Sequence, residues 1–141
     1  THDHKYISKL SADGIISQIG STNQKIEAIC GVSPVLMRPP GGYIDTRSLS
    51  VVGNMGMSAI MWSIDTRDWQ HRNAQRTIDT VLSQVRDGDI ILMHDIYSTS
   101  ADAAVVLIPE LTARGYQLVT VRELAAYRGG AAPGHKYSQF R

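Results

Sequence analysis

Short apolar runs alternate with longer stretches of helical periodicity along this chain. Four runs have the length and composition of buried strands, and they cover residues 34–37, 58–64, 90–93 and 117–121. Apolar residues three or four positions apart predict helices at about residues 11–30, 46–54, 73–86, 101–114 and 122–127. Strand and helix therefore alternate about every 25–30 residues, which is typical of βαβ units around a parallel sheet. The pattern predicts an α/β fold.

The same pattern predicts which residues form the core. For the first long helix the predicted buried face contains Ile15, Ile16, Ile19, Ile26 and Ile29, with Cys30 as a core thiol. For the later helices it contains Ile78, Val81, Leu82 and Val85, and then Val105, Leu107, Ile108 and Leu111. Residues 129–141 show no period, so a domain of residues 1–128 followed by a surface tail is expected.

Composition narrows the function classes. The chain has 141 residues, 43% hydrophobic and 19% charged, with a formal net charge of +1. This length suits one domain, and the charge gives no basic excess that would favour nucleic-acid binding. The apolar runs are far too short to span a bilayer, so no membrane span is expected. Cys30 is the single cysteine, which excludes an internal disulfide.

Polar side chains directly follow three of the predicted strands. Arg38 follows the first, residues 65–69 follow the second, and His94 with Asp95 follow the third. Because the carboxyl ends of parallel strands meet at one face of the sheet, these polar residues are expected to converge there. His94 is therefore the first candidate catalytic residue. The alternative is a histidine that only caps the loop after its strand.

Three motifs carry a resemblance to a known family. They are Arg38-Pro39-Pro40-Gly41-Gly42, Asp65-Thr66-Arg67-Asp68-Trp69 and Leu92-Met93-His94-Asp95. In this order and spacing they resemble the later motifs of the polysaccharide deacetylase (NodB-homology) family of carbohydrate esterases. Thr1-His2-Asp3-His4 resembles the end of the family's His-Ser/Thr-x-x-His metal motif. The resemblance runs from Thr1 to about Tyr127.

One family motif has no match. The family's first motif is a strand that ends in an Asp-Asp pair, and this sequence contains no such strand. The resemblance implies that the chain is the C-terminal two-thirds of the catalytic domain. The implied fold is a partial, distorted (β/α) barrel of parallel strands that lacks its N-terminal strands. A companion N-terminal fragment would supply the Asp-Asp motif and a metal-binding histidine.

The resemblance also implies roles for individual residues. His94 matches the general acid that protonates the leaving group, and Asp68 matches the carboxylate that holds this histidine. Asp65 is the alternative for that role, and a helix-start cap is the alternative for Asp68. Arg38 matches the arginine that pairs with the family's catalytic base. His4 matches a ligand of the divalent metal ion, expected to be zinc or cobalt, and His2 is its alternative.

Three residues match substrate-binding positions of the family, and a fourth would substitute for a missing ring. Gly41 occupies a position whose backbone N–H helps to hold the oxyanion, where the family often has tyrosine; Tyr43 would replace the missing ring. Trp69 and Leu92 match residues that line the small acetyl pocket. For Leu92, an ordinary core position is the alternative, because a buried strand predicts it equally well.

The function implied is that of a metal-dependent hydrolase that removes acetyl groups from a carbohydrate. N-acetylglucosamine units of peptidoglycan or of a chitin-like polymer are the first expected substrate, and acetylxylan is the alternative. A second alternative is an inactive fragment or a carbohydrate-binding piece, because the Asp-Asp motif and the first metal histidine are absent. The resemblance implies an extracellular or cell-wall location.

Overall fold

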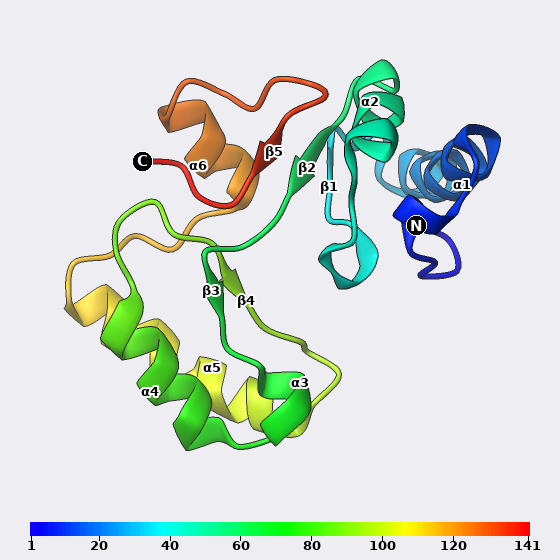
Figure 1. Ribbon diagram of the computed structural model, residues 1–141. Helices are drawn as coiled ribbons and strands as arrows, with labels where there is room; N and C mark the ends of the chain where they lie inside the picture. Colours follow the sequence, from blue (N-terminus) through cyan, green and yellow to red (C-terminus); the bar gives the residue numbers. More distant parts are fainter. The chain divides into compact units, whose positions relative to one another are not determined.

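The computed structural model describes residues 1–141, which form two compact units (Figure 1). Unit 1 contains Thr1–Met61 and Gly129–Tyr137, and unit 2 contains Trp62–Arg128 and Ser138–Arg141. Each unit combines helices with a small parallel sheet. The predicted α/β fold with parallel strands is therefore confirmed.

The sheet of unit 1 has three parallel strands. β1 (Leu36–Met37), β2 (Ser58–Ile60) and β5 (Lys136–Tyr137) lie in the order β1-β2-β5 (Figure 1). Leu36 pairs with Ser58, and Ala59 pairs with Lys136. The central strand is buried along its whole length, whereas β5 lies at an edge of the sheet.

The helices of unit 1 are η1 (Ile7–Lys9), α1 (Ala12–Cys30), η2 (Pro40–Gly42) and α2 (Thr46–Asn54). α1 begins after Ser11, whose side chain accepts a hydrogen bond from the backbone N–H of Gly14, and it ends at Gly31 in the left-handed conformation (φ 70°). The core of the unit contains Ile7, Ile15, Ile19, Val52 and Met57.

Part of the predicted α1 face is wrong. Ile16, Ile26 and Ile29 are 47%, 38% and 84% exposed, and Cys30 is exposed instead of a core thiol. Only Ile15 and Ile19 of this helix belong to the core, and both lie in its N-terminal half. Periodicity identifies the stripe of apolar residues but not the length over which another element covers it.

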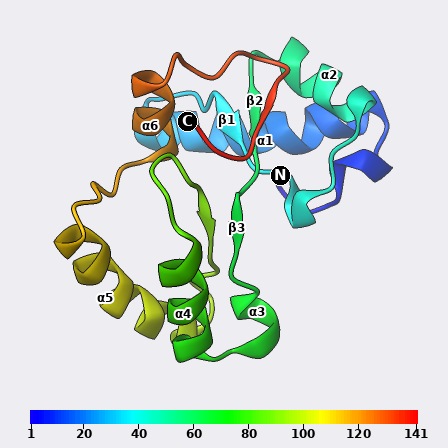
Figure 2. The same ribbon diagram turned by 60° about the vertical axis from the view of Figure 1, so that its left-hand side comes forward.

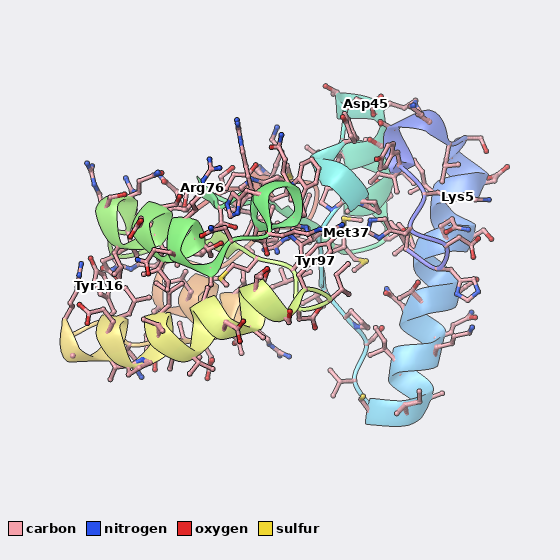
Figure 3. All side chains as sticks on the ribbon, turned by 90° about the horizontal axis from the view of Figure 1, so that it is seen from below. Lys5, Met37, Asp45, Arg76, Tyr97 and Tyr116 are labelled. Atoms are coloured by element: carbon pink, nitrogen blue, oxygen red, sulfur yellow. The ribbon has the colours of Figure 1, made fainter.

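Unit 2 contains the parallel pair β3 (Ile64–Asp65) and β4 (Ile91–Leu92), together with α3 (Asp68–His71), α4 (Ala74–Gln84), α5 (Ser98–Ala113) and α6 (Val121–Tyr127). α4 and α5 lie side by side in both ribbon views (Figure 2). Their shared core contains Ile78, Val81, Ala103, Leu107 and Leu111. Tyr116 lies just beyond the end of α5 (Figure 3). Its hydroxyl donates to the carbonyl of Val85 at 3.1 Å.

Two of the predicted strands differ from the structure. Residues 58–64 form two strands in separate sheets, β2 in unit 1 and β3 in unit 2. The N–H of Met61 donates to the carbonyl of Tyr137, whereas the N–H of Ser63 donates to that of Ile90, so the backbone changes its partner strand between these residues. Residues 117–120 form no strand, because an extended segment joins a sheet only where a neighbour pairs with it and none does here.

The C-terminal segment, residues 129–141, has more structure than a surface tail. Most of its residues are exposed, but β5 belongs to the sheet of unit 1 and Phe140 is only 4% exposed. The N–H of Phe140 donates to the carbonyl of Gly88 at 2.9 Å, and Arg141 forms an ion pair with Asp89. The sequence lacks a period here because the segment is held by single contacts and not by an apolar face.

None of the helices is both long and apolar enough to cross a membrane.

Candidate active site

Among the candidate residues that the sequence singled out in unit 2, His94 and Asp68 have the closest ionisable side chains. His94 follows β4, and Asp68 is the first residue of α3, which follows β3. Nδ1 of His94 lies 2.7 Å from Oδ1 of Asp68, and the backbone N–H of His94 donates to Oδ2 of Asp68 at 2.6 Å. The side chain of Asp68 is 1% exposed, and that of His94 is 35% exposed. A buried carboxylate thus holds a histidine that solvent can reach.

Ser100 completes the surroundings of this carboxylate. It lies in the first turn of α5, is 2% exposed, and donates its hydroxyl to Oδ2 of Asp68 at 2.6 Å. Asp68 therefore accepts three hydrogen bonds, two from His94 and one from Ser100. Sequence reasoning missed Ser100, because a serine near the start of a helix is common and no motif marks it.

The hydrogen bonds set the charge of Asp68. Burial by itself raises the pKa of the carboxyl group, but the bonds from Ser100 and from the side chain and backbone of His94 outweigh it and hold the pKa below its ordinary value of 3.8. Asp68 is consequently ionised at neutral pH, so the proton in the Asp68–His94 hydrogen bond belongs to Nδ1 of His94. Nε2 is then the nitrogen left for exchange with a substrate.

A second group of bonds fixes α3 against the strands. The hydroxyl of Thr66, which is 2% exposed, donates to the backbone carbonyl of Leu92 at 2.7 Å. His71 is half-buried. Its Nε2 lies 2.9 Å from the carbonyl oxygen of Thr66, and its Nδ1 accepts a hydrogen bond from the N–H of Asn73. These contacts position the helix that carries Asp68.

The remaining predicted residues of unit 2 divide by exposure. Leu92 is 8% exposed and lies in β4, which suits both an acetyl-pocket wall and an ordinary core position. Trp69 is 49% exposed and follows Asp68 in α3. Asp65 is exposed and accepts a hydrogen bond from the N–H of Arg67, so the structure gives the contact with His94 to Asp68 and not to Asp65.

The other predicted residues, Arg38, Gly41, Tyr43 and His4, belong to unit 1. Arg38 follows β1 and has an exposed side chain, although the atoms around its guanidinium desolvate it and lower its pKa. Because the ordinary pKa of an arginine side chain lies far above 7, Arg38 stays charged at physiological pH. Gly41 lies in η2 with φ 61°, a conformation that favours glycine.

Tyr43 is paired with a residue that the sequence did not single out. The rings of Tyr43 and Tyr6 lie 4.7 Å apart between centroids. A Cβ atom at Gly41 would lie 2.9 Å from Cδ2 of Tyr43 and 3.1 Å from Cε1 of Tyr6. The space that a side chain at position 41 would need is therefore filled by two tyrosine rings.

His4 is the predicted metal ligand in this chain. It is exposed, and its φ of 55° is uncommon for a residue other than glycine. Nowhere in residues 1–141 do three histidine, cysteine, aspartate or glutamate side chains come together in an arrangement that could hold a metal ion. The residues present thus fit at most a part of such a site, which is the contribution that the resemblance implied.

Comparison with known proteins places these motifs in a family. The family described as "Polysaccharide deacetylase" matches residues 1–60. The peptidoglycan-N-acetylmuramic acid deacetylase PdaC of Bacillus subtilis is 45% identical over 86% of this chain. The peptidoglycan-N-acetylglucosamine deacetylase PgdA of Listeria monocytogenes is 37% identical over the same share. The chain belongs to the polysaccharide deacetylase family. It spans about a quarter of the length of these two relatives.

Solved structures agree with this assignment. A structure described as T48 deacetylase with substrate matches 96% of this chain with a TM-score of 0.87 and 37% identity, and the chain covers 66% of it. An acetyl xylan esterase of Clostridium thermocellum in complex with a cobalt ion matches 93% of this chain with a TM-score of 0.82 and 29% identity, and the chain covers 65% of it. The family is metal-dependent.

Proposed function

We propose that this chain is part of a hydrolase that removes acetyl groups from amino sugars of peptidoglycan. The observation that carries the proposal is the contact of 2.7 Å between the buried carboxylate of Asp68 and the half-exposed His94. The identity of 45% to a peptidoglycan deacetylase supports the choice of substrate. N-acetylglucosamine and N-acetylmuramic acid are both named among the relatives, so either sugar is a candidate.

His94 acts as the general acid. Asp68 holds the imidazole through Nδ1, which leaves Nε2 outside this contact and available to donate a proton. When the C–N bond of the acetamide breaks, the leaving nitrogen takes the proton from Nε2 and departs as a neutral amine. Asp68 stays ionised throughout, because its hydrogen bonds stabilise the carboxylate.

A divalent metal ion, zinc or cobalt, would be held in part by His4. When bound, such an ion activates a water molecule and polarises the carbonyl of the acetyl group. We propose that the other ligands and the catalytic base, which Arg38 would orient, come from a companion N-terminal segment. The solved relatives are about half as long again as this chain, which leaves room for such a segment.

Trp69 and Leu92 are proposed to line the acetyl pocket, and the backbone N–H of Gly41 to stabilise the oxyanion. Leu92 is a buried apolar residue at the end of β4, two residues before His94, and its side chain suits the methyl group of an acetyl. Trp69 directly follows Asp68 in the sequence. Because peptidoglycan lies outside the membrane, the proposal also locates the protein at the cell wall.

Acetylxylan is the second candidate substrate, since an acetyl xylan esterase shares this fold and 29% of the sequence. The two reactions differ in the leaving atom, which is nitrogen in an acetamide and oxygen in an acetate ester. The complete protein, loaded with cobalt, is incubated with peptidoglycan and separately with acetylxylan, and released acetate is measured. Acetate from peptidoglycan alone supports the proposal, acetate from acetylxylan alone replaces it, and no acetate from either favours the carbohydrate-binding alternative.

A further inference from the structure

Two tyrosine rings in unit 1 contact each other but remain largely in solvent. Tyr6 is 41% exposed and Tyr43 is 55% exposed, although their ring centroids lie 4.7 Å apart at an angle of 42°. We call these two residues the tyrosine pair. Apolar burial does not explain the pair, because a ring that packs only for that reason loses most of its exposure.

Buried neighbours fix both rings in place. Ile7, which follows Tyr6 and begins η1, is 0% exposed and belongs to the core of unit 1. On the other side, Pro40 is buried, and its carbonyl accepts a hydrogen bond from the N–H of Tyr43 at 3.3 Å. The two backbone segments are thus anchored, and the rings stand out from them without the freedom of a flexible loop.

Gly41 makes the arrangement possible. Its φ of 61° is strained for any residue with a side chain, and a Cβ atom there would come within 2.9 Å of Tyr43 and 3.1 Å of Tyr6. The backbone at this position leaves space for rings that come from two different elements. Three residues separated by up to 37 positions (6 to 43) therefore combine to present one exposed aromatic surface.

We propose that the tyrosine pair is a sugar-binding subsite that stacks against a pyranose ring of the glycan. This inference rests on the proposed function. One face of a pyranose ring consists of C–H groups that pack on aromatic rings, while its hydroxyls need polar partners, and tyrosine offers both surfaces. Lys9, whose ammonium lies 5.6 Å from the ring centroid of Tyr6, adds a further donor for a sugar oxygen.

The position along the chain favours a sugar over other ligands. Tyr6 lies two residues after His4, and Tyr43 lies five residues after Arg38. His4 and Arg38 are candidate active-site residues, and they belong to the same unit as the tyrosine pair. A polymeric substrate needs contacts beyond the sugar that reacts, because such contacts align the scissile bond. The tyrosine pair would contribute binding and alignment and no proton transfer.

Calorimetric titration with tetra-N-acetylchitotetraose tests the subsite in the complete, metal-loaded protein. All variants carry His94→Ala, so that the oligosaccharide is not consumed. Tyr6→Ala and Tyr43→Ala should each raise Kd about two- to tenfold, the range that a single aromatic contact provides. The double variant should lose less than the product of the two effects, because the rings contact each other. Tyr43→Trp, which keeps an aromatic face, should bind nearly as the parent does.

Tyr127→Ala is the matched control. Tyr127 is 82% exposed and lies in unit 2, so its removal should leave Kd unchanged. The subsite is disproved if the parent does not bind the oligosaccharide, if Tyr6→Ala and Tyr43→Ala bind as the parent does, or if Tyr127→Ala loses as much affinity. Melting curves of the variants, expected to match the parent because the rings are exposed, exclude misfolding as the cause.

Acetate release by the protein with His94 intact separates this inference from the proposed function. Release of acetate together with an unchanged KM for Tyr6→Ala and Tyr43→Ala would remove the subsite and keep the deacetylase. Binding that depends on both tyrosines in a protein that releases no acetate would keep the subsite and remove the deacetylase.

Discussion

Asp68 uses both of its carboxylate oxygens to hold its neighbours. Oδ1 contacts Nδ1 of His94, and Oδ2 accepts hydrogen bonds from the N–H of His94 and from the hydroxyl of Ser100. The pairing of Asp68 with His94 could be predicted from the sequence, because the two motifs resemble those of a known family in order and spacing. The role of Ser100 could not be predicted from the sequence, because it depends on how the start of α5 lies against α3. The sequence did not single out Tyr6 for the same reason, because its contact with Tyr43 joins separate segments of the chain.

Removing the hydroxyl of Ser100 should weaken the dyad without breaking it. Ser100→Ala deletes one of three hydrogen bonds to a buried carboxylate, which costs about 1–3 kcal/mol in the free energy of unfolding at pH 7. The low pKa of Asp68 contributes stability above its ordinary value of 3.8, and this contribution is lost as pH falls through the lower folded value. The loss caused by Ser100→Ala should therefore shrink only as pH falls through the folded pKa of Asp68, which lies below 3.8.

Urea unfolding at pH 7 and at a series of lower pH values that extends well below 3.8 measures this difference. Ser98→Ala, an exposed serine in the same helix turn, should change stability little, and Ser100→Thr should retain most of it. A loss that stays the same over the whole pH series would show that Ser100 acts through packing and not through the charge of Asp68.

His94→Ala should lower kcat of the complete enzyme by a factor of roughly 10²–10⁴, since general acid catalysis is typically worth that much. Bound metal should stay at the level of the parent, because the histidine holds no metal in this proposal. Acetate release and metal content are measured on the same sample. Unchanged turnover would remove His94 from the mechanism.

His4→Ala should have the opposite signature. We expect less bound metal after dialysis against a fixed concentration of cobalt, because one ligand is lost. His2→Ala serves as the control, since His2 is the rival ligand two residues away. Metal content that falls only in the His2 variant would transfer the role to His2.

At the scale of elements, the sequence predicted the presence of the helices better than their buried faces. α2 has the predicted bounds, and α1 begins and ends within one residue of them. In α5 the sequence is apolar at every position from 103 to 108, so the period cannot separate the two faces. The strands were harder still, because two or three paired residues define each one.

Substitutions in α5 test its buried face. Val105 and Ile108 were predicted to belong to that face, but they are 74% and 54% exposed. Leu107 is 4% exposed and packs between α4 and α5, so Leu107→Ala should cost about 2–5 kcal/mol in the free energy of unfolding. Val105, two residues earlier, is 74% exposed, and Val105→Ala should stay within about 0.5 kcal/mol of the parent. Denaturant unfolding compares the two, and equal effects would mean that both faces of α5 are covered.

At the scale of the whole molecule, the C-terminal segment takes part in both units. Residues 129–137 belong to unit 1 and residues 138–141 to unit 2. In unit 2, Asp89 accepts hydrogen bonds from the side chains of Ser63 and Arg141 and from the N–H of Arg86, at 2.9, 2.6 and 2.8 Å. Burial alone raises the pKa of Asp89, but these bonds outweigh it and lower the pKa below 3.8.

Asp89→Asn should therefore destabilise the protein at neutral pH and have less effect in acid. The charge of Asp89 contributes above pH 3.8, and the contribution is lost as pH falls through the lower folded pKa. Thermal melts at pH 7 and pH 3.5 should show a fall in Tm that is larger at pH 7. Asp102→Asn, on the exposed side of α5, is the control; an equal fall there would discount the contacts of Asp89.

The path of the chain has a consequence for how the protein is made. The backbone passes between the units at residues 61–62, 128–129 and 137–138, so each unit includes residues from the final segment. Ala59 pairs with Lys136, and Gly88 bonds to Phe140, across long stretches of sequence. During synthesis neither unit can be completed until residues 129–141 have left the ribosome. The usual order in which an N-terminal part folds first does not apply here, and both units must finish folding after residues 129–141 have been made.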